Sequence, residues 1–410
     1  MGLLCRVGGW GLWSGYDNKK GVVILENNIT VKTISNIMKV DWTGFFKDNS
    51  IKGFSPHVSP ASYEPLKQYL NNHSFFKDEE NRKLVDDFIF TNVAIEKSNQ
   101  HYLYSFKMPN SIGPDFLTKN DLSSLNINKS FFENIGKGSN VRVFTSRVFE
   151  QDGILENIIL LIKVGETTDE SSKNFFVTVN IDFINSFFSI NFSKNSLKFM
   201  DAPVVSLLST VKTYLESNIF DVFNITPTIL NEYSLKRALF NLYAELSDGI
   251  EERLERFLPD DMQAITAQFL GEINVEYDEK YLNQITAILY QDRSGLDNIQ
   301  LYPDGWVSRF LFQDGDCTRA SSRTDQLEPI YTSPIYWNLK ELIRGKNELL
   351  DVGFVWITNL GGENVNIYVR LDVINENISV HFYQKGLYTY LRREKENYVR
   401  GKIREVLPAN

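Results

Sequence analysis

The sequence predicts an α+β protein, with mainly antiparallel sheets, in which one strand–strand–strand–helix unit occurs twice. Stretches 177–192 and 367–382 align without gaps and share Val, Asp, Ile, Asn, Ser and Phe at equivalent positions. Each stretch follows another apolar run and precedes a segment of helical periodicity. Four regions are therefore predicted, namely a β-rich N-terminal region at 1–150, a first unit at 151–225, a helical region at 226–300, and a connector loop with the second unit at 301–410.

Composition places the chain among globular proteins of a reducing compartment. Of its 410 residues 42% are hydrophobic and 23% charged, a balance that supports packed cores rather than disorder. The net charge of -9 argues against general adhesion to nucleic acid or to anionic membranes. Only Cys5 and Cys317 are present, no signal peptide is evident, and no apolar run is long enough to span a bilayer. We therefore expect a cytoplasmic protein with no membrane association.

The N-terminal region is expected to contain two hairpins and a further strand. Asn27 and Asn28 favour a tight turn between strands at 22–26 and 29–32. A second hairpin is predicted from strands at 88–96 and 102–108, and the alternating pattern at 141–149 predicts another strand.

Helices are expected after the first unit and throughout the middle of the chain. Pro203 favours the first turn of a helix that follows Asp201. Leucines from 235 to 246 recur at helical spacing, while Asp248-Gly249 predicts an interruption and Pro259 an end. Two more apolar stripes follow, and we interpret them as core packing: Met262, Ile265 and Phe269, then Tyr281, Ile285 and Ile288.

The polar stretch 304–325 is the best ligand-site candidate in the connector, where a strand at 307–312 is also expected. Asp304, Asp314 and Asp316 are spaced closely enough for an oxygen-ligand metal site, but the full calcium-loop signature is absent. Arg319 and Arg323, with neighbouring hydroxyl groups, suit an anion instead. A solvated surface loop is the alternative, and no metal site is predicted.

The last predicted helix, 387–406, is basic in an otherwise acidic chain. Residues 385–405 hold seven basic side chains against three acids. This pattern is typical of a solvated helix face, and it also fits a face that contacts phosphates or an acidic partner protein. The candidate binding residues here are Arg392, Arg393, Lys395 and Arg400.

No strong catalytic or cofactor motif is present. Asp182 and Asp372 occupy equivalent positions at strand ends, where carboxylates commonly cap turns. A P-loop is absent, and the four histidines form no metal-ligand spacing. A metal-dependent nuclease would need an acid near an acid-x-Lys pattern. Asp86 or Asp87 with Glu96-Lys97 has the wrong spacing, and Asp278-Glu279-Lys280 opens a predicted helix.

These observations favour a non-catalytic binding or scaffold subunit of a cytoplasmic prokaryotic multiprotein assembly. A protein partner is expected, and nucleic acid is a further partner that the basic last helix suggests; no cofactor is predicted. The many Asn, Lys and Ile residues suggest an AT-rich genome, and anti-phage defence is a hypothesis from that character alone. A metal-dependent nuclease, or another enzyme that acts on phosphodiesters, is the alternative.

Overall fold

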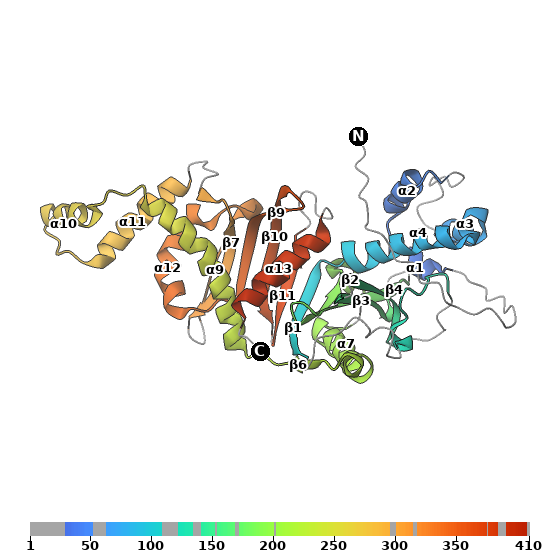
Figure 1. The fold of residues 1–410 in the computed structure, drawn as a ribbon. Helices are drawn as coiled ribbons and strands as arrows, with labels where there is room; N and C mark the ends of the chain where they lie inside the picture. The colour runs from blue at the N-terminus through green and yellow to red at the C-terminus, as the bar shows by residue number, and fades with distance from the viewer. Residues whose placement is uncertain are drawn as a thin grey trace.

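One large antiparallel sheet runs through the computed structural model, with helices packed on both faces (Figure 1). It confirms the predicted α+β class with antiparallel strands. The structure describes residues 29–51, 63–108, 122–133, 141–151, 154–168, 172–200, 202–295, 301–314, 318–374, 376–383 and 391–407.

Eleven strands of the described chain form this sheet, in the order β2-β3-β4-β5-β1-β11-β10-β9-β7-β8, with β6 paired to β1. Strands β3 to β5 form one meander and strands β9 to β11 another. The strands are β1 (Gln100–Lys107), β2 (Arg142–Gln151), β3 (Ile154–Glu166), β4 (Asn174–Asp182), β5 (Phe187–Phe192), β6 (Thr226–Thr228), β7 (Gly305–Asp314), β8 (Thr318–Arg323), β9 (Asp351–Leu360), β10 (Glu363–Ile374) and β11 (Asn377–Phe382).

Strand β1 joins the two meanders, because it pairs antiparallel with β5 on one side and with β11 on the other. The hairpins differ in register. Val179 lies opposite Ile190, whereas the equivalent Val369 lies opposite Phe382, which is two residues farther along the gapless alignment. Both stretches therefore form antiparallel hairpins, and their common ancestry stays a prediction.

Helices cover the sheet in three groups, each with its own hydrophobic cluster. Helices α7 and α8 pack on the first meander, α1 to α4 form a separate cluster with β2 to β4, and α9, α12 and α13 cover the second meander. The helices are α1 (Val31–Ile34), α2 (Lys39–Asp48), α3 (Glu64–Asn72), α4 (Glu79–Phe90), α6 (Lys194–Leu197), α7 (Val204–Asn218), α8 (Phe220–Phe223), α9 (Glu232–Glu255), α10 (Met262–Glu272), α11 (Glu279–Ser294), α12 (Pro334–Lys346) and α13 (Arg392–Val406).

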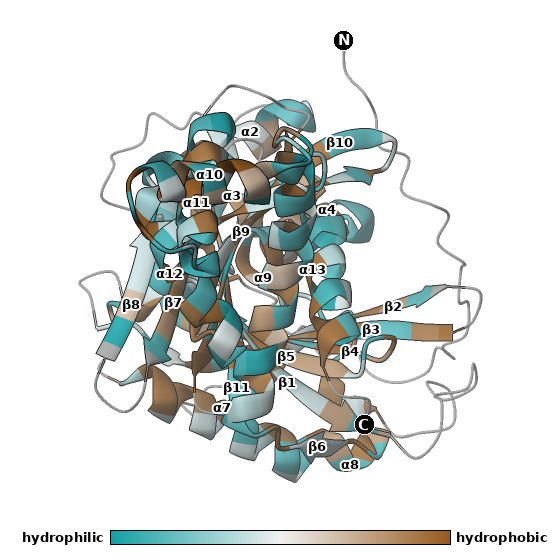
Figure 2. Ribbon diagram, turned by 90° about the vertical axis from the view of Figure 1, so that its left-hand side faces the viewer, coloured by the Kyte–Doolittle hydropathy of each residue, from teal (hydrophilic) through white to brown (hydrophobic). Residues whose placement is uncertain are grey.

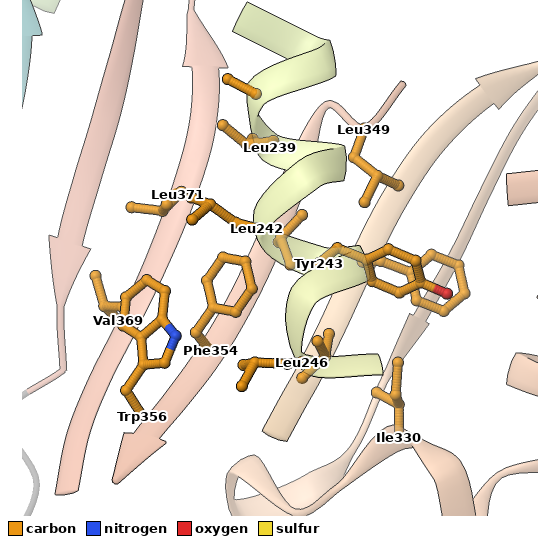
Figure 3. Packing of buried hydrophobic residues seen from close by; sticks show 14 of the residues in the cluster. Leu239, Leu242, Tyr243, Leu246, Ile330, Leu349, Phe354, Trp356, Val369 and Leu371 are labelled. Carbon is orange, nitrogen blue, oxygen red and sulfur yellow. The ribbon is translucent and has the colours of Figure 1, made fainter. Parts of the chain in front are cut away.

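Helix α9 shows how the largest cluster forms. Its leucines recur every three or four residues, so that Leu239, Leu242 and Leu246 share one face. That face lies over Phe354 and Leu371 of the sheet (Figure 3). The predicted interruption at Asp248-Gly249 is wrong, since α9 continues to Glu255. A single glycine costs a helix only about 1 kcal/mol, which this packing exceeds.

Two other local predictions are also wrong. Residues 88–96 form the end of α4 and a π-helical turn, not a strand. The stretch 304–325 is not a long loop, because β7 and β8 form an antiparallel hairpin within it. The strands expected at 102–108 and 141–149 are confirmed as β1 and β2. The segment 29–32 leads into α1 instead of forming a strand, and its expected partner, 22–26, lies outside the described residues.

Candidate functional site

Helix α13 carries ionic and apolar residues on neighbouring faces. Arg392, Glu396 and Arg400 are spaced four residues apart, which places them on one side of the helix. Val399 and Ile403 point into the cluster that α13 shares with α9. The helix thus buries apolar and charged side chains together.

The charged side chains of α13 form a buried network with β1 and β4. Arg392 Nε lies 2.5 Å from Glu396 Oε1, and Arg400 Nε lies 3.1 Å from Asp182 Oδ2. Glu396 is also 3.6 Å from His101 Nε2, and Arg392 donates to the Ser98 carbonyl oxygen at 2.9 Å. The network therefore connects the last described helix to the central strand β1 and to β4 of the first meander.

Burial and neighbouring charges determine the protonation of this network. Burial lowers the pKa of His101 to about 4, although Glu396 opposes that shift. Burial alone would raise the pKa of Glu396, but Arg392, His101 and Arg400 hold it below its ordinary value. At neutral pH the network thus contains a neutral imidazole and an ionised carboxylate.

The expectation of a solvated basic face on α13 is wrong for three of its four candidate residues. Arg392, Lys395 and Arg400 are each less than 9% exposed. Arg393 is the most exposed of the four; its guanidinium lies 3.3 Å from Glu156 and over the ring of Phe149. A cavity of about 20 Å³ beside Arg393 and Arg400 has room for a single water molecule. These residues hold α13 on the sheet.

The other two candidate residues lie on β8, at one margin of the sheet. Arg319 and Arg323 are both exposed, and β8 pairs only with β7 in the part of the chain that the structure describes. Of the three connector acids considered as metal ligands, Asp304 forms an ion pair with Arg253, at 3.3 Å. Asp316 lies outside the described residues. The structure does not bring the β8 arginines into the α13 network.

A wide groove, which sequence reasoning missed, opens between the end of α9 and helices α10, α11 and α12. Its volume is about 1,120 Å³. Tyr290 and Trp337 lie on its wall, with their rings 5.3 Å apart. Helices α10 and α11 form an arm that projects away from the sheet (Figure 1). The groove is therefore open along one side and large enough for a segment of another protein.

The groove and the shallower hollow beside it are strongly acidic. Together they are lined by eight carboxylates and three cations, a local net charge of -5. Lys340 and Arg344 are already engaged by Glu251, at 2.8 Å each. The carboxylates are Asp248, Glu251, Glu252, Glu255, Asp260, Asp278, Glu279 and Glu341.

The arm exposes the apolar stripes that the sequence predicts as core. Ile265, Phe269 and Ile288 are 44%, 51% and 66% exposed, whereas Thr266 and Leu270 are the buried residues of α10. Figure 2 shows apolar stretches on α10 and α11 as brown segments of the arm. The interpretation of these stripes as core packing is wrong, because no described element covers that side of the arm.

Two of the acids considered for a nuclease accept hydrogen bonds from backbone donors. Asp86 accepts from the Phe131 N–H at 2.8 Å, and Asp278 accepts from the Lys280 N–H at 2.9 Å as the N-cap of α11. Within the described ranges, no three His, Cys, Asp or Glu side chains gather in a way that could hold a metal ion. None of the described helices combines the length and apolar character needed to cross a bilayer.

Comparisons of the chain with protein-family models, with curated proteins and with solved structures found no match.

Proposed function

We propose that the chain is a non-catalytic binding subunit that holds a basic, amphipathic helix of a partner protein in the groove beside the arm. The acidic groove, with apolar side chains exposed next to it, is the observation that carries this proposal. Its charge favours a cationic partner, and its aromatic wall favours an apolar face on the same segment.

Two features of the groove support a helical occupant. Helices α11 and α12 border it, and a groove with helical walls suits the helix-in-groove mode of recognition. Helix α11 has 16 residues, so it spans about 24 Å at the usual rise of an α-helix. A partner helix of four turns would match that length.

The proposal extends to a cytoplasmic prokaryotic assembly, with anti-phage defence as its role. Its support is compositional: two cysteines in 410 residues suit a reducing compartment, and abundant Asn, Lys and Ile suit an AT-rich genome.

Fluorescence anisotropy with a designed peptide tests the groove. The probe is a labelled amphipathic helix with lysines on one face and leucines on the other, and its control carries glutamates in place of the lysines. We expect the lysine peptide to bind the full chain with an affinity that falls as salt rises, because charged groups attract each other less when screened. The glutamate peptide should not bind.

Substitutions localise the binding. Glu341→Lys and Ile288→Ser lie in the groove lining and should each weaken binding at least tenfold. The matched controls are Glu216→Lys on α7 and Ile229→Ser before α9, both exposed residues away from the groove. The proposal is contradicted if groove and control variants bind the peptide equally, or if the wild-type chain does not bind it at all.

A further inference from the structure

Among the described residues, no strand pairs with the outer edge of β8, beside the two exposed arginines. Thr324 N donates to the Ser308 carbonyl oxygen at 3.2 Å, so Thr324 turns its backbone groups towards β7. Because the register of β7 and β8 is constant, Ser322 and Ala320 are the next residues of β8 whose backbone groups are hydrogen-bonded to β7. In an antiparallel pair the residues between these point their N–H and C=O groups outward. Those residues are Arg319, Ser321 and Arg323.

The side chains of these three residues also share one face. Strand side chains alternate, and here Arg319, Ser321 and Arg323 are exposed, whereas Ser322 is buried and Ala320 packs against the main cluster. Within the described ranges, no other strand pairs with β8. Outward hydrogen-bonding groups and two cationic side chains thus occur at the same three residues.

We propose that β8 accepts an extended acidic segment of a partner protein as an additional strand of the sheet. In such a pairing, acidic side chains four residues apart would lie opposite Arg319 and Arg323, and a small residue midway would lie opposite Ser321. Directly opposed side chains in paired strands are close enough for ion pairs. Main-chain hydrogen bonds supply affinity in this mode, and the charges supply register.

Charge disfavours a second copy of the chain as the occupant. If two β8 strands paired antiparallel about Ser321, Arg319 of one copy would oppose Arg323 of the other. Like charges directly opposite each other destabilise a sheet. The opposite edge strand, β2, is less available for pairing, because Ser146 on its outer side already exchanges backbone hydrogen bonds with Asn126 and Asn128.

The arginines also have a simpler explanation, because charges on an edge strand discourage accidental pairing. A short peptide distinguishes the two roles. It carries glutamates four residues apart among threonines and valines, and a second version has N-methyl groups on the amides that face β8. We expect the first peptide to bind and the N-methylated version to bind at least tenfold more weakly. Equal binding of both versions would mean that charge alone attracts the peptide, and it would overturn strand addition.

Amide hydrogen exchange gives a residue-level test. Upon binding, exchange should slow at Arg319, Ser321 and Arg323 and change little at Ala320 and Ser322, whose N–H groups already face β7. A variant with both Arg319→Gln and Arg323→Gln should bind the acidic peptide at least tenfold more weakly. Its affinity for the lysine–leucine peptide of the groove should not change. No binding at low salt, or slowing without this alternation, contradicts the inference. Groove variants leave this site intact, so the two proposals fail separately.

Discussion

Arg400 of α13 and Asp182 of β4 form a buried ion pair, with Nε and Oδ2 3.1 Å apart although 218 residues separate them in sequence. Asp182 also accepts from the backbone N–H of Asn185 at 2.9 Å, so its predicted role as a turn cap is confirmed. The C-terminal helix is therefore fixed to the first meander by a residue that also shapes a turn.

Arg400→Ala should destabilise the protein by about 3 kcal/mol or more, because it leaves Asp182 and Glu396 buried with one cation fewer. Lys402→Ala is the matched control on the same helix. Lys402 pairs with the half-exposed Glu245, so its loss should cost less than about 1 kcal/mol. Chemical denaturation measures both, and equal costs would contradict a stabilising role for the buried network.

The stability of the protein should depend on the protonation of His101. Its pKa is about 4 in the folded chain against 6.5 ordinarily, so the unfolded state binds a proton more readily. This stabilisation is complete above pH 6.5 and declines as the pH falls towards 4, by about 2 kcal/mol between pH 7 and pH 5. Denaturation at both pH values, compared with His101→Gln, should show that loss in the wild type alone. A parallel decline in the variant would assign it to other groups.

Asp372 should have the opposite effect on stability. It lies opposite Asp351 on the neighbouring strand, and burial together with that carboxylate raises the pKa of Asp372 to about 6. The folded state therefore holds the proton more tightly, and this contribution to stability is lost as the pH rises through 6. Between pH 5 and pH 8 the loss should be about 1 kcal/mol. Asp372→Asn should remove this dependence, and a variant that keeps it would contradict the assignment.

The exposed apolar residues of the arm should contribute little to folding. Replacing Ile265, Phe269 and Ile288 by Ser should change the free energy of unfolding by less than about 1 kcal/mol, because surface substitutions rarely cost more. Leu239→Ala, at a fully buried position of α9, is the comparison and should cost about 2–5 kcal/mol. Thermal unfolding tests this, and comparable losses would show that the arm packs against something in solution.

Residue patterns predicted the elements whose periodicity is long or alternates cleanly. Strands β1 and β2 lie close to their expected bounds, and α9, α10 and α11 contain the predicted apolar stripes, although α9 continues through the expected interruption. The apolar run 88–96 is rich in Phe, Ile and Val, and such short runs fit strand and buried helix equally well. Its helical outcome depends on packing that the pattern does not encode.

The candidate sites were harder to predict, because burial depends on distant residues. The arginines of α13 have the spacing of a solvated face, and nothing nearby in sequence indicates that Asp182 and His101 meet them. The stripes on α10 and α11 show the opposite case. Periodicity identifies an apolar face, but it does not reveal whether another element covers that face.

Photo-crosslinking tests the groove proposal most directly. A benzophenone side chain at position 288 would lie in the groove lining, and one at position 184, exposed on the first meander, is the control. With the lysine–leucine peptide, we predict crosslinks at position 288, their loss at high salt, and none at position 184. Equal crosslinking at both positions, or none at 288 under conditions where the peptide binds, would contradict the proposal that this groove holds the partner.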